Sequence, residues 1–334
     1  MTPYLAAPLP FPARRPAGFA PLEDEPVFDP ARHLRIEMPE TIIPLAEFGY
    51  SDAQIAECPT GFGATSVFRI LSDEGAACML DVARKLEAFT TSNARISRNV
   101  RGGAYRSAFL RDLCLSPELN DAMSRIAGIP LLPHTLPHQL GHLNYNPLDV
   151  GENVDKWHVD TLRIDFVMFV TDPKSVQGGE FQYYLGTKDE VAALRKAEQP
   201  LDPGKILSPA MPGPGYAVLQ QGNMVVHRAK GLDAPGERIT MVNGYVPRDI
   251  DFPDYTRFDQ LCLVDPADVA ASEYARHAAW MARERLNARL AGFAFDADNI
   301  AMADAFDDFA RSMATTAQQL RAAGTATVEH FGDG

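Results

Sequence analysis

The stretch Trp157-His158-Val159-Asp160 places two side chains that can bind a metal ion one residue apart. Residues two apart on a β-strand point to the same face, so we expect His158 and Asp160 to reach one metal ion from a single strand. His227, far downstream, would supply a third ligand. Two imidazoles and one carboxylate on one side of an ion leave its other coordination positions open.

The sequence that surrounds this motif is typical of strands from about residue 139 onward. Branched and aromatic residues fill segments that are bounded by Gly, Pro and Asp, namely QLGHLNYNP, DTLRIDFVMFVTD, EFQYYLG, GYAVLQQGNMVVHRA and RITMVNGYV. Because no helix follows each segment, an antiparallel sandwich or barrel is favoured over a doubly wound sheet. We therefore predict a mainly β fold with flanking helices.

Helices are expected before, within and after these strands. Ser72 and Ser116 stand as N-caps before two amphipathic stretches, and Thr187 with Glu190 forms a T-x-x-E capping box before a third. A long helix is expected between residues 265 and 292, with one or two more beyond it. The predicted organisation is a Pro-rich arm (1–40), a single domain (41–250) with a helical preface (41–132) and a strand-rich core (133–250), and a helical extension packed on that core (251–334).

Composition limits the classes of partner. The chain has 334 residues and a net charge of −13, which argues against general nucleic-acid binding. Its four cysteines lack CxxC spacing, so reduced thiols are expected rather than a zinc knot or a disulfide framework. No apolar run approaches the roughly 20 residues that cross a bilayer, and the first residues lack the pattern of a signal peptide. No membrane partner is expected, and the cytoplasm is the expected compartment.

Arg238 follows His227 by eleven residues and offers a planar cationic fork for a carboxylate. Thr240 lies two residues further on, on the same face of a strand, and can add a hydroxyl. The pattern H-x-D, then H, then R-x-T resembles the Fe(II)/2-oxoglutarate-dependent dioxygenases. The W-H-x-D and G-E-R-I-T motifs are similar to those of the small-molecule hydroxylase branches of that family. Their spacing is that of the phytanoyl-CoA hydroxylase and taurine dioxygenase types. The resemblance covers roughly residues 139 to 247.

The resemblance implies a fold, cofactors and an activity. The core would be a double-stranded β-helix (a cupin-like jelly roll), with Fe(II) held by His158, Asp160 and His227 at its open end. Arg238 would bind the distal carboxylate of 2-oxoglutarate, helped by Thr240. With O₂, the cosubstrate would be decarboxylated to succinate and CO₂ while a C–H bond of a small molecule is oxidised, most simply by hydroxylation. The family's halogenases have a small residue in place of Asp160, so its carboxylate favours oxygenation.

Further residues are candidates for contacts in the pocket. Tyr145 and Asn146 are predicted neighbours of the cosubstrate, against ordinary strand packing, and His142 or Asn144 can line the cavity. Four arginines favour an anionic substrate, although those of the 97–106 loop can equally form ion pairs in a solvated loop. Arg163 can instead pair with Asp165 on its own strand face. The four substrate candidates are Arg98, Arg101, Arg106 and Arg163.

Two other functions remain open from the sequence. A cupin-like module could bind a metal or a ligand without turnover, but it would have no need for a carboxylate clamp at the position of Arg238. A zinc hydrolase could use the same three ligands, but no general base stands at motif spacing. The C-terminal helices are expected to pack on the sheet or to join two copies of the chain in a homodimer.

Overall fold

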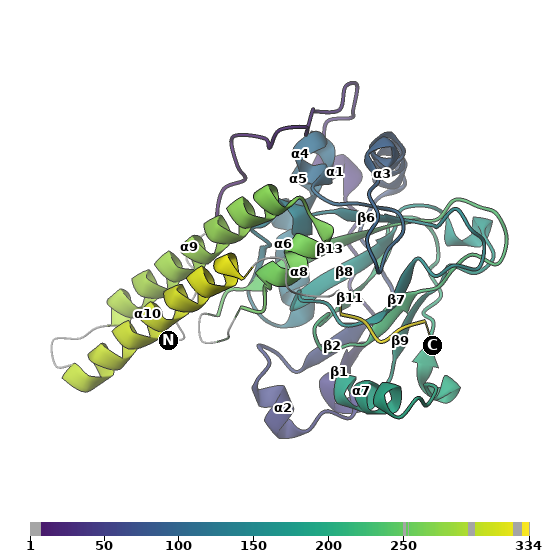
Figure 1. The fold of residues 1–334 in the computed structure, drawn as a ribbon. Helices are drawn as coiled ribbons and strands as arrows, with labels where there is room; N and C mark the ends of the chain where they lie inside the picture. The colour runs from purple at the N-terminus through teal and green to yellow at the C-terminus, as the bar shows by residue number, and fades with distance from the viewer. Residues whose placement is uncertain (1–7, 250–251, 253, 293–297, 323–328, 334) are drawn as a thin grey trace.

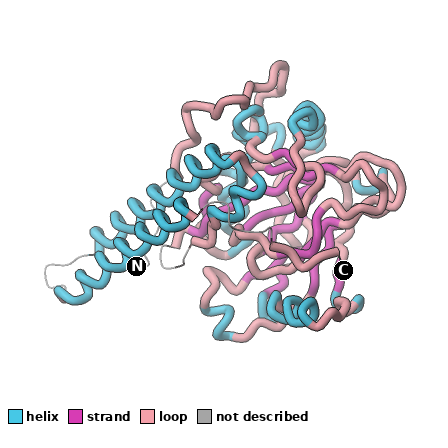
Figure 2. Tube along the Cα trace, in the orientation of Figure 1, coloured by secondary structure: helices cyan, strands magenta, loops and turns pink. Residues whose placement is uncertain are grey.

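The computed structural model describes residues 8–249, 252, 254–292, 298–322 and 329–333. Its strand-rich body contains two antiparallel sheets (Figures 1 and 2). In chain order the strands are β1 (Ile42–Pro44), β2 (Phe62–Thr65), β3 (Phe68–Arg69), β4 (Asn99–Val100), β5 (Leu131–Pro133), β6 (His142–Tyr145), β7 (Asp155–His158), β8 (Ile164–Phe169), β9 (Phe181–Tyr184), β10 (Ile206–Leu207), β11 (Tyr216–Gln220), β12 (His227–Ala229) and β13 (Ile239–Pro247).

The larger sheet runs β1-β2-β11-β8-β13-β6-β4, with β3 also paired to β11 and β5 to β13. Its central strand β8 is buried along its whole length. Phe166 and Met168 face the apolar cluster beneath the helices, whereas Val167 and Phe169 face the cluster shared with the smaller sheet. Side chains that alternate between two apolar environments explain why residues 166–169 of β8 form a continuous hydrophobic run.

The smaller sheet runs β10-β9-β12-β7. Residues 329–333 lie against the free edge of β7, where Trp157 forms an isolated bridge with Gly332. Two antiparallel sheets with flanking helices confirm the predicted fold class at that level. The expectation of a helical preface over residues 41–132 was wrong in one respect. That segment also supplies β1 to β4, which extend the larger sheet at both ends.

The helices begin where the capping residues indicated. The Ser72 and Ser116 side chains accept from the backbone N–H groups of Gly75 and Leu119. Thr187 likewise accepts from the Glu190 N–H, and the Glu190 carboxylate also binds Tyr184 and Lys205. The helices are α1 (Pro30–His33), α2 (Asp52–Ala56), α3 (Asp73–Leu86), α4 (Gly103–Arg106), α5 (Ala108–Cys114), α6 (Pro117–Ala127), α7 (Lys188–Lys196), α8 (Phe258–Val264), α9 (Ala267–Gly292) and α10 (Asn299–Arg321).

Helices α9 and α10 lie side by side and extend away from the body (Figure 1). Near the body, Trp280 and Met281 of α9 pack on Leu132 and Val246, at the edge of the larger sheet. The short helix α8, which sequence patterns did not indicate, sits between the sheet and α9 and buries Phe258 and Leu261.

Two expectations about the whole chain can be compared with the described residues. No helix among them is both long enough and apolar enough to cross a bilayer. The four cysteines all carry free thiols, as expected from their spacing.

Candidate metal centre

Two neighbouring strands of the smaller sheet bring the predicted histidines together. His158 ends β7, His227 begins β12, and the antiparallel register places them directly opposite each other. Their rings are 4.2 Å apart between centroids. One ligand atom from each of His158, Asp160 and His227 lies within 4.8 Å of the others. The structure thus brings together three residues that are far apart in sequence.

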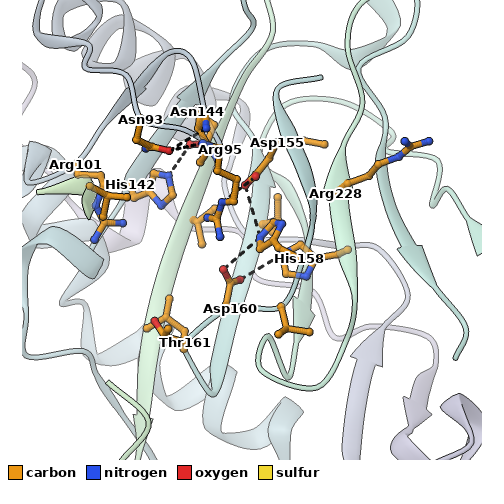
Figure 3. Close-up of a pocket in the computed structure, with 18 of the residues that line it drawn as sticks. Asn93, Arg95, Arg101, His142, Asn144, Asp155, His158, Asp160, Thr161 and Arg228 are labelled. Carbon is orange, nitrogen blue, oxygen red and sulfur yellow. Dashed lines mark hydrogen bonds and ion pairs between the residues drawn. The ribbon is translucent and has the colours of Figure 1, made fainter. Parts of the chain in front are cut away.

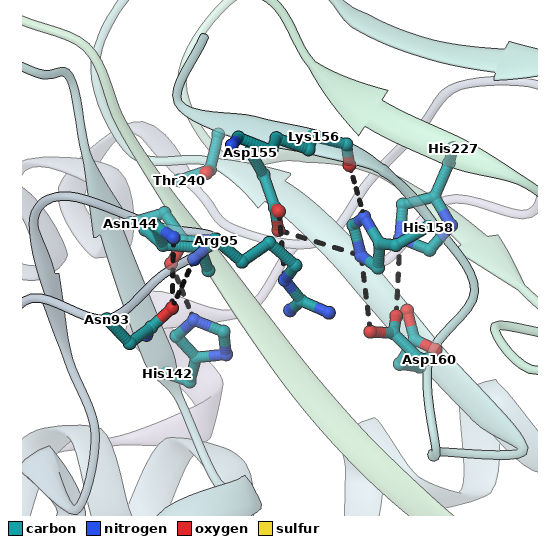
Figure 4. Close-up of polar contacts among 12 residues, drawn as sticks. Asn93, Arg95, His142, Asn144, Asp155, Lys156, His158, Asp160, His227 and Thr240 are labelled. Carbon is teal, nitrogen blue, oxygen red and sulfur yellow. Dashed lines mark hydrogen bonds and ion pairs between the residues drawn. The ribbon is translucent and has the colours of Figure 1, made fainter. Parts of the chain in front are cut away.

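Asp160 reaches the centre by a different route from the one predicted. Strand β7 ends at His158, so Asp160 lies beyond the strand rather than on its face. Its backbone N–H donates to the carbonyl of Gly222, 2.9 Å away, which fixes the turn. The carboxylate then lies 3.4 Å from the His158 Nε2 and 3.2 Å from the His227 Nε2 (Figure 4). The H-x-D spacing was right, but the expectation of a single strand was wrong.

Backbone carbonyls orient both imidazoles for metal binding. The Nδ1 of His158 lies 2.6 Å from the carbonyl oxygen of Lys156, and the Nδ1 of His227 lies 2.9 Å from that of Val225. An Nδ1 that donates to a carbonyl carries a proton, so in the neutral ring the Nε2 lone pair is available to a metal ion. Such contacts behind the ligands hold the ring and the tautomer that a metal ion requires.

The pKa shifts of these three residues are typical of a site that binds a cation. Burial opposes ionisation of Asp160, but His227 and His158 hold the pKa of its carboxyl well below the usual value. Burial tends to lower the pKa of His227, yet Asp160 raises it above the ordinary value. Burial, aided by Arg95, lowers the pKa of His158. A carboxylate that draws positive charge to its neighbours can draw a divalent ion in the same way.

Three residues that no motif indicated form the floor of the centre. Gln220 donates from its amide to the Oδ1 of Asp165 at 3.0 Å, and the same nitrogen lies 3.2 Å from the Nε2 of His227. Burial, then the charge of Asp160, raises the pKa of Asp165 well above the usual value. A Cβ on Gly222 would lie 2.0 Å from Asp165 Oδ2 and 3.1 Å from the Asp160 Cβ, so only glycine fits between the two carboxyl groups.

Arg238 is fully buried and directly precedes β13, and it lies behind Thr240, which lines the cavity beside the metal ligands. Its Nε donates to the carbonyl of Gly179 at 2.7 Å and its Nη1 to the hydroxyl of Thr240 at 3.1 Å. Its Nη2 is buried and has no hydrogen-bond partner among the described residues. Burial lowers the pKa of Arg238 to about 10, so the guanidinium stays charged at neutral pH. A buried cationic donor without an acceptor is costly unless a ligand supplies one.

Gly179 makes this position of Arg238 feasible. Its φ is +78°, and a Cβ there would lie 3.2 Å from the Cδ of Arg238 and 2.8 Å from a Leu232 methyl group. The glycine therefore serves backbone geometry, as predicted for the Gln177–Glu180 turn, and its carbonyl also holds the guanidinium in place.

A cavity of about 110 Å³ connects the metal ligands with the Thr240 hydroxyl. That volume exceeds the need of a single water molecule and suits a small organic ligand. Polar side chains such as His142, Asn144, Asp155 and His158 gather around it (Figure 3). The residues that line it include Asn93, Arg95, Ile96, Arg101, Gln139, His142, Asn144, Asp155, His158, Val159, Asp160, Thr161, Leu162, Val167, Phe181, His227, Arg228, Ala229, Thr240, Val242, Gln260, Leu261, Val264 and Glu329.

The alternation of β6 decides which of its side chains reach this cavity. His142 and Asn144 line it, with the His142 Nε2 2.5 Å from the Asn144 Oδ1, and burial lowers the pKa of His142 to about 3. Tyr145 points the other way into the core and donates to the Ala83 carbonyl at 2.7 Å. Asn146 pairs with the backbone of Arg238, donating to its carbonyl and accepting from its N–H. The structure thus places Tyr145 and Asn146 outside the lining of the cavity.

Of the four predicted substrate arginines, Arg101 alone lines this cavity, and both arms of its fork bind Asp265, at 2.6 and 2.9 Å. Arg98 pairs with Glu87, and Arg106 binds the carbonyls of Gly18 and Ala20. Arg163 lies 4.1 Å above the Tyr255 ring and lines a smaller cavity. Asp165, its suggested partner, accepts from Gln220 instead. The structure therefore brings neither Arg98, Arg106 nor Arg163 to the metal centre.

Comparison with known proteins returned structural matches only. No family model and no curated protein matches the chain. Among solved structures, the non-heme alpha ketoglutarate dependent epimerase SnoN from nogalamycin biosynthesis is 16% identical, with 55% of this chain and 78% of that chain covered and a TM-score of 0.42. EctD from S. alaskensis, with 2-oxoglutarate and 5-hydroxyectoine, is 18% identical, with 72% and 87% covered and a TM-score of 0.41.

HygX from Streptomyces hygroscopicus, with nickel and 2-oxoglutarate bound, is 13% identical, with 55% and 83% covered and a TM-score of 0.39. The structures matched thus include proteins that depend on 2-oxoglutarate or bind it. Likenesses at these identities and TM-scores establish neither the activity nor the substrate of this chain. Both have to be inferred from the residues of its own site.

Proposed function

We propose that this chain is an Fe(II)- and 2-oxoglutarate-dependent oxygenase that oxidises a C–H bond of a small molecule, most simply by hydroxylation. One observation carries the proposal. One cavity is lined both by an open set of two histidines and one carboxylate and by Thr240, and directly behind Thr240 lies the buried Arg238, whose Nη2 has no acceptor among the described residues. A cosubstrate with a chelating end and a distal carboxylate matches both features.

The donor set fits Fe(II) well. His158, Asp160 and His227 would hold the ion through two neutral imidazole nitrogens and one ionised carboxylate, the combination typical of non-haem iron oxygenases. When bound, the iron would supply the activation of O₂ that is coupled to decarboxylation of 2-oxoglutarate to succinate and CO₂. Asp160 occupies the place that a halide ion would need, so oxygenation is favoured over halogenation.

The residues of the chain bind and orient the other reactants. Arg238 would receive the distal carboxylate of 2-oxoglutarate on its Nη2, and the Thr240 hydroxyl would support it from the cavity wall. Because Arg238 is fully buried, this ion pair would be strong and directional. The apolar side chains of Leu162, Val167 and Val242 line the cavity and would limit the access of water during turnover.

The proposed function also suggests how the fold and the domains of the chain are organised. We infer that the two sheets correspond to a double-stranded β-helix core within residues 133–250. We also infer that residues 41–250 form one oxygenase domain and residues 251–334 its helical extension. A module that binds only a metal ion is disfavoured, since the buried Nη2 of Arg238 would then lack an acceptor.

Cosubstrate turnover without a prime substrate tests the proposal. Purified protein with Fe(II), ascorbate and 2-oxoglutarate in air is expected to release succinate slowly. The double variant Asp160→Ala, His227→Ala should abolish this release, whereas Asp121→Ala, which removes an exposed carboxylate on α6, should leave it unchanged. Succinate release by the double variant at the wild-type rate would overturn the proposal.

A further inference from the structure

Arg95 lines the cavity beside the metal centre. Figures 3 and 4 show its guanidinium between His142 and Asn144 on one side and the His158–Asp160 pair on the other. A tight turn fixes its backbone, because the Asn93 Oδ1 accepts the N–H groups of Arg95 and Ile96 at 2.9 and 3.0 Å. The placement of Arg95 is therefore built into the loop.

The guanidinium of Arg95 has N–H donors that no described residue uses. Its one ionic contact is with Asp155, at 2.9 Å between Nε and Oδ1, and it donates no side-chain hydrogen bond within the described residues. The other arginines of the cavity are used differently. Arg101 binds Asp265 with both arms, and Arg228 donates to Gln182 and to the Asp333 carbonyl while lying over the Trp157 ring. Of the three arginines that line the cavity among the described residues, Arg95 therefore has the most donors left for a ligand.

The position of Arg95 relates it directly to the metal centre. Its partner Asp155 is buried, and the Oδ2 of Asp155 lies 3.6 Å from the Nε2 of His158. Asp155 therefore lies between Arg95 and the metal ligand His158 and contacts both, so a group bound to Arg95 would lie near the metal centre. Neutralising Asp155 requires one charge but not the five N–H donors of a guanidinium, and Arg95 lines the cavity.

We propose that Arg95 binds a carboxylate of the prime substrate, so that the substrate class is a small carboxylic acid. The planar fork of arginine matches the two oxygens of a carboxylate. A dianionic phosphate is disfavoured, because Asp155 and Asp160 already place two negative charges nearby. The distal carboxylate of 2-oxoglutarate is assigned to Arg238, at another part of the cavity. This inference rests on the proposed function and specifies the substrate of that same site.

Matched pairs of ligands test this proposal. The probes are aliphatic and aromatic monocarboxylic acids of three to eight carbons and the carboxamide of each, titrated into protein loaded with Mn(II) and 2-oxoglutarate. Wild-type protein is expected to bind at least one acid tenfold or more tightly than its amide. Arg95→Gln should lose that preference, and Arg95→Lys should restore part of it. Arg98→Gln, in the same loop but paired with Glu87 outside the cavity, is the control and should keep it.

Three results would overturn the inference. The first is a wild type that binds no acid more tightly than its amide. The second is an Arg95→Gln variant, folded by its melting temperature, that keeps the preference. The third is a tenfold or greater rise in the 2-oxoglutarate dissociation constant of Arg95→Gln, which would assign Arg95 to the cosubstrate. Succinate release by the wild type is measured separately, so the proposed function can stand if this inference fails.

Discussion

Arg238 carries a full charge in a buried site where two of its three nitrogens donate to the protein. Substituting Arg238→Leu removes the donor proposed for the distal carboxylate of 2-oxoglutarate. Loss of one partner from a buried charged pair costs about 2–4 kcal/mol, so the dissociation constant should rise roughly 30- to 1000-fold. Calorimetric titration of 2-oxoglutarate into Mn(II)-loaded protein measures this rise.

The control for Arg238→Leu is Arg84→Leu. Arg84 is half-exposed and pairs with Glu237, the residue that precedes Arg238, so the same loss of charge occurs outside the cavity. Its 2-oxoglutarate affinity is expected to stay within twofold of the wild type. If Arg238→Leu also bound 2-oxoglutarate as the wild type does, Arg238 would have been assigned wrongly.

Gly222 separates Asp160 from Asp165, and its replacement should disturb the metal ligand. In Gly222→Ala the new methyl group would overlap with the Asp165 carboxylate and crowd the Asp160 side chain. We expect the affinity for Mn(II) or Co(II) to fall at least tenfold in a metal titration. Gly213→Ala is the matched control, since a Cβ there meets nothing within 4 Å. Equal metal affinity in the two variants would contradict this reading of Gly222.

At the scale of single residues, spacing located the atoms of the centre but not their support. The motifs predicted that His158, Asp160 and His227 would share one metal ion and that Thr240 would lie near them. The structure brings the three ligands together and places Thr240 in the wall of the cavity. The supporting residues Gln220 and Asp165 follow no fixed spacing, because their contacts depend on how two sheets stack. Asn144 lines the cavity while Tyr145 faces the core, since strand register chooses between neighbours that sequence alone cannot separate.

At the scale of elements, the pairing of β7 with β12 creates the centre, and residues 329–333 cover the other edge of β7. The Trp157 N–H donates to the Gly332 carbonyl at 2.9 Å, and Phe331 packs into the cluster that contains Trp157, Tyr184 and Val191. This segment therefore occupies an edge whose backbone groups would otherwise be open to solvent or to another chain. No strand pattern in the sequence indicated it.

Phe331→Ala should loosen this segment without unfolding the sheet. Removing the ring takes away its apolar anchor, so amide hydrogen exchange at Trp157 is expected to accelerate at least tenfold. Ile300→Ala, which removes an exposed apolar side chain on α10, should leave that exchange unchanged. Unaltered exchange at Trp157 in Phe331→Ala would mean that Phe331 does not hold the segment.

At the scale of the whole molecule, two buried histidines link stability to pH. Burial lowers the pKa of both His134 and His142 to about 3, against about 6.5 in an unfolded chain. Above pH 6.5 both states are neutral and these residues contribute no pH dependence. Between pH 6.5 and pH 3 the unfolded state binds protons that the folded state does not, so stability falls as the pH falls.

From pH 7.5 to pH 5.5 these two histidines should lower the free energy of unfolding by roughly 2–3 kcal/mol. In His142→Gln about half of that loss should disappear, because one of the two groups no longer titrates. Urea denaturation of wild type and variant at both pH values measures the difference. An identical loss in both proteins would show that His142 is not held neutral in the folded state.

The sequence predicted the architecture where local signals and global packing agree. The N-caps of α3, α6 and α7 and the long helix α9 follow from local hydrogen bonding and periodicity. The strands β1 to β4 were missed, because two to four residues are too few to show a period and gain their stability from the larger sheet. Arg95, on a loop, carries no pattern at all, so only the structure reveals that it reaches the cavity.

The central claim is that the metal ligands and Arg238 serve one cosubstrate. The most direct measurement is the dissociation constant of 2-oxoglutarate with and without Mn(II), together with that of Mn(II) with and without 2-oxoglutarate. If both bind in one cavity and share the ion, each should tighten the other by the same factor, at least tenfold. The Asp160→Ala, His227→Ala variant should lose this coupling. Equal 2-oxoglutarate affinity in the presence and absence of Mn(II) would contradict the account.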